Sequence, residues 1–163
     1  MEALTVRAAG PQDYEAIRVL TLDVYIGGGL AGPDYQVKLA DVEDRARYAE
    51  LLVAVVGDRV VGSVAFARHA TAYAEITTHP DEAAFRMLAV SPEDRGRGAG
   101  RALVQACIDR ARSVGVRRIV ISSEPIMLAA HRLYASMGFQ REPSRDWSPL
   151  PGVDLVCYVL MLA

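Results

Sequence analysis

The stretch from Phe85 to Arg112, FRMLAVSPEDRGRGAGRALVQACIDRAR, constrains the fold of this chain more than any other part of it. Its apolar start favours a strand that ends at Ser91 and Pro92, and its later part favours an amphipathic helix over residues 98–112. The helix prediction rests on small and apolar residues that share one helical face: Gly100, Leu103, Val104, Cys107, Ile108 and Ala111. A strand is therefore joined to a helix through a glycine-rich loop.

This loop is a candidate anion-binding site. The first backbone N–H groups of a helix have no partner within the helix and carry a partial positive charge. Glycines at 96, 98 and 100 let an anion approach these groups closely, and Arg95, Arg97 and Arg101 add positive charge. The loop suits a pyrophosphate, although the same glycines taken alone favour a tight turn with solvated arginines.

The rest of the chain alternates between strand-like and helix-like patterns. Strands are predicted at 4–8, 51–56, 59–67, 82–90, 117–122 and 154–162. Besides 98–112, helices are predicted around Ile17, Leu20 and Val24 up to the glycines at 27–29, over a polar surface segment at 36–49, and over 126–137. Gly57 and Asp58 lie between two strands and have the turn chemistry of a tight antiparallel hairpin.

Composition excludes several classes of protein. The 163 residues suit one domain, and the formal charge of −2 argues against a dedicated nucleic-acid binder. The alternative of a nucleic-acid-associated protein would rely on five arginines, Arg95, Arg97, Arg101, Arg110 and Arg112. Lys38 is the only lysine, so the chain has no Walker-type phosphate loop.

The sequence also bears on location and on cysteine chemistry. The N-terminal residues lack the pattern of a signal peptide, and no apolar run reaches the roughly 20 residues of a membrane span. We therefore expect a cytoplasmic protein with no membrane partner. Cys107 and Cys157 have no metal-ligand spacing, so we expect buried thiols and no metal site.

Two segments resemble the GNAT superfamily of N-acetyltransferases. RGRGAG at 95–100 matches the Q/R-x-x-G-x-G/A signature of that family, and the strand RRIVIS leads to a helix that contains LYASMGF at 133–139. The resemblance implies a single α/β (α+β) domain over 1–163, with a central mixed, largely antiparallel sheet flanked by helices. A Rossmann dinucleotide site is disfavoured, because its acidic residue about 20 positions onward is replaced by Val120.

The resemblance also implies a cofactor and its binding residues. Strands four and five of such a sheet splay apart, and the pantetheine arm of acetyl-CoA, the co-substrate, enters between them. Its implied main-chain contacts are Leu88, Ala89 and Val90. The pyrophosphate would lie on the glycine-rich loop, at Arg95, Gly96, Arg97, Gly98, Ala99, Gly100 and Arg101.

By resemblance, the reaction is direct transfer of acetyl to a primary amine in a ternary complex. The backbone N–H of Leu88 would bind the developing oxyanion, and Tyr134 would donate a proton to the leaving thiolate. Tyr134 could instead be a core residue beside the apolar stripe of its helix, formed by Ile126, Ala130, Leu133 and Met137. The acceptor would be a small-molecule or peptide amine, and a homodimer is an open possibility.

Two positions depart from the family pattern. Met127 replaces an asparagine that contacts the pantetheine arm, and Ala84 replaces a glutamate base on strand four. Glu82 lies on the same face, roughly 7 Å away, and could act through a water or be a solvated carboxylate at the strand end. Glu124 is a weaker candidate, and an amine of low pKa would need no base. The departures also leave open a non-catalytic acyl-CoA-binding module.

Three further features are candidates for the acceptor site. The glycine-rich segment from Tyr25 to Tyr35 could form a lid or a plain loop. The loop at 145–152 carries Trp147, which could line an amine pocket or pack on the sheet edge. His131 could face the same cleft or be a surface residue.

Overall fold

The computed structural model describes residues 2–162, whose strands form a mixed sheet in the order β1-β2-β3-β4-β5-β8-β6, with β7 paired to β8. The strands are β1 Leu4–Ala8, β2 Glu50–Val56, β3 Arg59–Arg68, β4 Glu82–Val90, β5 Arg118–Ser123, β6 Gln140–Arg141, β7 Trp147–Leu150 and β8 Val153–Met161. Only β4 and β5 run parallel among the strand pairs of these residues. The sheet is therefore mixed and largely antiparallel, as predicted.

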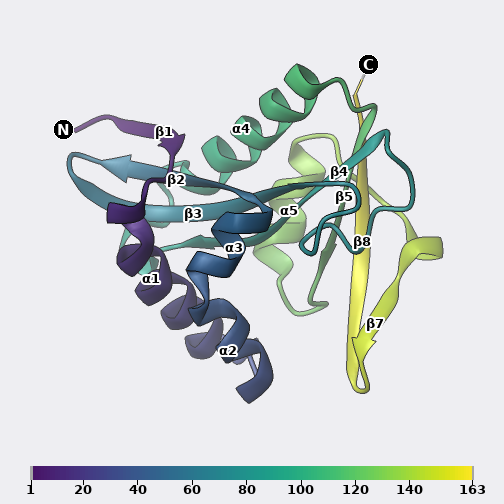
Figure 1. The fold of residues 1–163 in the computed structure, drawn as a ribbon, viewed down its shortest axis with the longest axis horizontal. Coiled ribbons are helices and arrows are strands. Elements are labelled where there is room, and N and C mark those ends of the chain that lie inside the picture. The colour runs from purple at the N-terminus through teal and green to yellow at the C-terminus, as the bar shows by residue number, and fades with distance from the viewer. Residues whose placement is uncertain (1, 163) are drawn as a thin grey trace.

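Helices cover both faces of the sheet (Figure 1). They are α1 Tyr14–Gly27, α2 Pro33–Ala40, α3 Val42–Tyr48, α4 Ala99–Val114 and α5 Leu128–Ser136. Buried residues of α4 and α5 share one core cluster with β2 to β5, whereas α1, α2 and α3 contribute to two clusters on the other face. Both cysteines are buried free thiols, in line with the sequence.

Strand β4 contributes to both core layers because its side chains alternate between the faces. Ala83 and Phe85 pack with α4 and α5, whereas Ala84 packs with α1 and α2. The alternation then changes phase, since Met87 and Ala89 both belong to the α1 and α2 side. This phase change marks a β-bulge, which inserts an extra residue into one strand of the pair.

The single helix predicted at 36–49 is wrong. The segment forms α2 and α3, separated at Asp41, whose ψ of 71° is not helical. The Asp41 carboxylate accepts a hydrogen bond from the Asp44 N–H at 3.1 Å and so caps the start of α3. The segment is also less superficial than expected, because Leu39 and Val42 are fully buried.

The other predicted elements are observed, with boundaries shifted by one or a few residues. Helix α5 begins two residues later than predicted and leaves Ile126 67% exposed, outside the apolar stripe. Two short strands, β6 and β7, lie between α5 and β8; the sequence gives no bounds for them, since both depend on pairing with β8. No helix between residues 2 and 162 is long and apolar enough to cross a membrane.

Candidate functional site

The two parallel strands β4 and β5 form a wedge that opens toward their C-terminal ends. Their pairing is confined to Glu82 with Arg118 and Ala83 with Ile119. Beyond this point β5 pairs only with β8, and β4 pairs only with β3. The backbone edge of β4 that faces β5 is thus free of sheet pairing from Ala84 onward.

A bulge in β4 lies at the open part of the wedge. In the pairing of β4 with β3, Arg86 lies opposite Ala65, and the next paired residue of β4 is Ala89, opposite Ser63. Met87 and Leu88 therefore have no partner in this ladder. Met87 has a φ of +58°, which is unusual for a residue other than glycine. The hydroxyl of Tyr25 on α1 donates a hydrogen bond to the Leu88 carbonyl at 3.2 Å. These features hold the backbone of Leu88 in a non-standard orientation at the wedge.

The glycine-rich loop leads directly into α4. Gly96 and Gly98 have φ values of +84° and +85°, and no atom lies within 4 Å of a Cβ built on either. The turn before them is anchored by Asp94, whose carboxylate accepts from Arg59 Nη1 at 2.6 Å. That hydrogen bond, together with the charge of Arg59, lowers the pKa of Asp94. The loop is therefore fixed at its base and open above its backbone, which fits an anionic group.

A cavity of about 460 Å³ lies beside the wedge. Its wall combines segments that are far apart in sequence: Tyr25, Leu30, Gly32, Pro33, Asp34, Tyr35, Lys38, Glu75, Phe85, Arg86, Met87, Leu88, Ile121, Ser122, Ser123, Glu124, Met127, Tyr134, Trp147, Pro149, Leu150, Val153 and Leu155. The structure thus brings together the bulge, Tyr134, the segment Tyr25 to Tyr35 and the loop with Trp147. Glu82 and His131 are not part of this wall.

Tyr134 combines a core ring with a position at the cavity wall. It is 5% exposed, and its ring lies 5.8 Å from that of Phe85 and 5.7 Å from that of Phe139. Burial raises the pKa of its hydroxyl. Within residues 2–162 this hydroxyl takes part in no hydrogen bond. Aromatic packing fixes the ring, and Tyr134 is part of the cavity wall.

The structure argues against the proposed role of Glu82 as a base. Its side chain is fully buried and pairs with Arg145 and with Arg118, whose Nε lies 2.7 Å away. Burial alone would raise the pKa of Glu82, but hydrogen bonds from Arg145, Arg118 and the Thr78 N–H outweigh burial and hold the pKa at about 2. A carboxylate so strongly stabilised in its charged form is a poor proton acceptor, and the solvated strand-end interpretation is wrong as well.

Glu124 has the opposite environment. It follows β5 at the cavity wall, and its carboxylate forms no hydrogen bond or ion pair with the described residues. Burial raises its pKa, which makes it a stronger base than an exposed carboxylate. Glu124 is therefore better placed than Glu82 to accept a proton inside the cavity.

His131 is engaged with other side chains. Its Nε2 lies 3.1 Å from Ser123 Oγ, and its ring packs 5.2 Å from that of Tyr158. Burial lowers its pKa, so the neutral ring is favoured. His131 thus supports the end of β5 from outside the cavity.

Trp147 lines the cavity and also joins the sheet, where it pairs with Leu155 of β8. Trp147 therefore lies at the sheet edge and at the cavity wall, whereas its role toward an amine stays a prediction. The indole N–H is buried without a hydrogen-bond partner among residues 2–162. A buried unpaired donor at a cavity wall is available to an acceptor atom of a ligand.

Four charged residues at or behind the cavity wall are not identified by the sequence analysis: Lys38, Glu75, Arg86 and the buried Arg45. Arg86 was the most accessible of these to sequence reasoning, because a charge interrupts the otherwise apolar strand EAAFRMLAV. The other three lie in α2, in the irregular segment before β4 and in α3, so only the folded chain brings them together.

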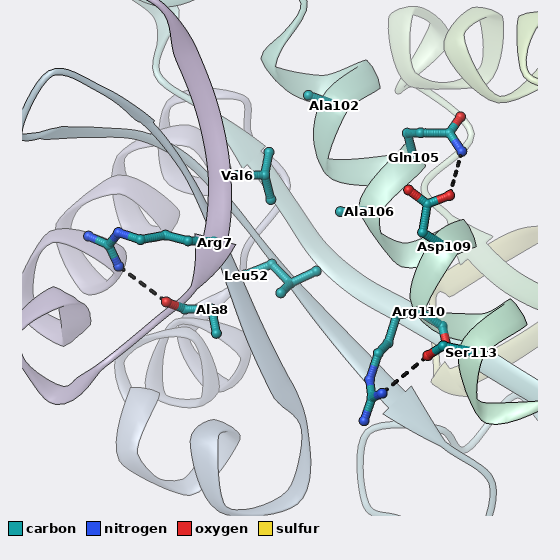
Figure 2. Close-up of a pocket in the computed structure, with 10 residues that line it drawn as sticks. All are labelled: Val6, Arg7, Ala8, Leu52, Ala102, Gln105, Ala106, Asp109, Arg110 and Ser113. Carbon is teal, nitrogen blue, oxygen red and sulfur yellow. Dashed lines mark hydrogen bonds between the residues drawn. The ribbon is translucent and has the colours of Figure 1, made fainter.

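A second, more open groove lies between β1, β2 and the outer side of α4 (Figure 2). Its polar side chains bond to near neighbours, such as Gln105 to Asp109 at 3.0 Å and Arg110 to Ser113 at 3.2 Å. None of the residues predicted for acetyl transfer or for cofactor binding lines this groove. The wedge and its cavity therefore remain the candidate site.

Comparison with known proteins identifies the family of the chain. Residues 15–139 match the model of the acetyltransferase (GNAT) family. The chain is similar to N-acetylaspartate synthetase of Danio rerio, with 31% identity over 62% of this chain and 33% of that protein. The matches span between about a fifth and a half of the length of the curated relatives that the chain matches.

Solved structures share the fold. A GCN5-related N-acetyltransferase from Kribbella flavida is 27% identical, covers 98% of both chains and superimposes with a TM-score of 0.71. A protein from Salmonella typhimurium, solved with its cofactor acetyl-CoA, is 24% identical with a TM-score of 0.73, covering 99% of this chain and 95% of that one.

Proposed function

The chain belongs to the acetyltransferase (GNAT) family, and from this premise we propose that it transfers acetyl from acetyl-CoA to a primary amine by direct attack in a ternary complex. One observation carries the proposal. The wedge between β4 and β5 opens onto a cavity whose wall contains both the bulge at Leu88 and the hydroxyl-bearing Tyr134. A proton donor and a free backbone edge thus meet where a thioester could lie.

The residues present fit acetyl-CoA. Positive φ values at Gly96 and Gly98 and the open space above them suit close approach of a pyrophosphate to the start of α4. The unpaired edge of β4 at Leu88, Ala89 and Val90 offers backbone groups to a pantetheine arm. Met127 replaces one polar contact of the family, yet its side chain still borders the cavity.

Acetyl-CoA supplies a thioester carbonyl carbon, to which the amine forms a C–N bond as the C–S bond breaks. In our proposal the Leu88 N–H donates a hydrogen bond to the carbonyl oxygen, where negative charge develops. The proton lost by the amine passes to the Glu124 carboxylate, and Tyr134 donates a proton to the leaving thiolate. Glu82 has no part in this scheme and instead supports the closed end of the wedge.

The acceptor and the setting of the reaction are also proposals. The name of the Danio rerio relative refers to an acetylated amino acid, which supports a small molecule as acceptor. We also propose that the protein acts in the cytoplasm and has neither nucleic acid nor a membrane as a partner; both a monomer and a homodimer are compatible with this proposal.

The proposal is tested with the purified chain in two measurements. Calorimetry should detect acetyl-CoA binding, and a panel of primary amines should include at least one that releases CoA and gains an acetyl group by mass spectrometry. Binding of acetyl-CoA without release of CoA by any amine would favour the non-catalytic acyl-CoA-binding module.

A further inference from the structure

The cavity has opposite charges on its two sides. Lys38 from α2 and Arg86 from β4 line the β4 side of the wedge together with Glu75, and Glu124 follows β5, the strand on the other side. The bulge at Leu88 belongs to the same wall. A molecule that reaches both sides would therefore meet cations at one end and a carboxylate at the other.

The two cations share a single carboxylate. Glu75 Oε1 lies 3.0 Å from Arg86 Nη1 and 3.7 Å from Lys38 Nζ. Both cations also lie over the ring of Tyr73, with Lys38 Nζ at 5.1 Å and Arg86 Cζ at 5.7 Å from its centre. Tyr73 is 1% exposed and so provides a fixed platform. Asp44, which accepts a hydrogen bond from the Tyr73 hydroxyl at 2.8 Å, adds a second negative charge near Lys38, so a positive surplus at this side depends on a third cation.

A third cation lies behind this side. Arg45 is 1% exposed, its Nη1 donates to the Leu39 carbonyl at 3.2 Å and contacts Met87 Sδ at 2.9 Å, and its Nη2 has no partner among residues 2–162. Burial lowers its pKa. A buried guanidinium without a carboxylate is costly unless negative charge lies nearby, and an anionic ligand at Lys38 and Arg86 would provide that charge.

We propose that the acceptor is an amine that also carries a carboxylate, such as an amino acid or a short peptide. Its carboxylate binds Lys38 and Arg86, and its amine lies toward Glu124. This inference rests on the proposed function and names the substrate class of the same site. A polyamine would bring a second positive charge against these cations, and the remaining acidic residue of the wall, Asp34, is exposed at the rim.

The first test compares matched amines. Amino acids with apolar, acidic and basic side chains are each supplied in three forms: the free acid, the primary amide and the decarboxylated amine. CoA release is measured for each form, and for spermidine as an example of a polyamine. The amine of the amide should have a pKa close to that of a peptide N-terminus, about 8. More of it is therefore neutral and nucleophilic near neutral pH, so the intrinsic reactivity of the amine favours the amide over the free acid. We expect kcat/KM for at least one free acid to exceed the values for its two analogues by about tenfold or more.

The second test uses charge-removing variants. Arg86→Gln and Lys38→Gln should each raise KM for the free acid about 10- to 100-fold and leave KM for the amide nearly unchanged. Glu75→Gln should act in the opposite direction and lower KM for the acid, because it removes the competing carboxylate. Arg112→Gln, at an exposed position on α4, is the matched control.

The outcomes separate this inference from the proposed function. If the enzyme prefers the amide, the decarboxylated amine or spermidine over the free acid, the inference about the carboxylate is overturned. The release of CoA in that experiment would still support the proposed function. Equal effects of Arg86→Gln on acid and amide overturn the inference as well. If the protein binds acetyl-CoA and acetylates no amine, the proposed function fails and the inference fails with it.

Discussion

Arg118 Nε lies 2.7 Å from Glu82 Oε2, and the same two residues are Cα partners in the short parallel pairing of β4 with β5. Backbone pairing and a buried ion pair therefore coincide at the closed end of the wedge. Arg145, which precedes β7, also pairs with this carboxylate. Glu82 thus joins three segments at the point from which the two strands diverge.

We expect Glu82→Gln to destabilise the protein. The change removes the negative charge that two arginines share, and breaking a buried pair in this way costs about 3–5 kcal/mol. The free energy of unfolding, from urea titration at pH 7, should fall by that amount. Asp23→Asn on the exposed side of α1 is the control and should change stability by less than about 0.5 kcal/mol. A Glu82→Gln variant as stable as the parent would contradict this structural role.

The same pair predicts how stability depends on pH. The pKa of Glu82 is lowered from 4.5 to about 2, so the ion pair contributes fully above about pH 4.5 and its contribution is lost as pH falls toward 2. The stability difference between the parent and Glu82→Gln should therefore shrink over this interval. Thermal unfolding of both proteins from pH 7 to pH 3 measures it, and a constant difference would be inconsistent with the lowered pKa.

The helices and strands were predictable where the local sequence pattern reflects how the residues are buried. The one-sided apolar spacing of α4 is recognisable in the sequence because it reflects a periodic burial pattern, and the central strands β2 and β3 are recognisable as short apolar runs on either side of a turn. The division of 36–49 into α2 and α3 depends on the cap at Asp41 and on burial of Leu39 and Val42, which tertiary packing decides. β6 and β7 are defined only by their pairing with β8.

The glycine loop predicts a charge-sensitive cofactor site. Gly98 has a φ of +85°, which asparagine and aspartate tolerate better than most residues, and open space surrounds its Cβ position. Gly98→Asp and Gly98→Asn are therefore matched in shape and differ in charge. We expect the aspartate variant to bind acetyl-CoA at least about tenfold more weakly than the asparagine variant at low salt, because its charge repels phosphate. Equal affinities by calorimetry would remove the loop from the cofactor site.

Tyr134→Phe should lower kcat with little change in acetyl-CoA affinity. The hydroxyl is proposed to act on the leaving thiolate, whereas the ring supplies the packing against Phe85 and Phe139. Loss of a general acid typically costs 10²- to 10⁴-fold in rate, so a reduction of about 100-fold is expected. Rates with a range of amines and calorimetry with acetyl-CoA separate the two effects. Unchanged turnover in the folded variant would make Tyr134 a core residue only.

The candidate site was predictable only in part, and the two carboxylates show why. Alternation along the strand places Glu82 on the same face as Ala84 and so makes it a candidate base. The sequence gives no sign that Arg145, 63 residues away, pairs with its carboxylate. Glu124 directly follows β5, and the sequence gives no sign that the fold partly buries it and leaves its carboxylate without a partner among the described residues. The difference between a structural and a reactive carboxylate lies in these long-range neighbours.

Glu124→Gln provides the sharpest test of proton removal. Burial raises the pKa of Glu124, so its basic form accumulates as pH rises, and the rate for the parent should rise with it. With an amino acid amide, whose amine pKa should be about 8, the variant should lose about 100-fold in kcat/KM near pH 7. The loss should narrow above pH 9, where the amine is already neutral without help. Acetyl-CoA affinity should be unchanged, and Glu124→Asp should retain part of the rate. If the profiles of the parent and Glu124→Gln superimpose across pH, the amine loses its proton to bulk water and Glu124 is not the base.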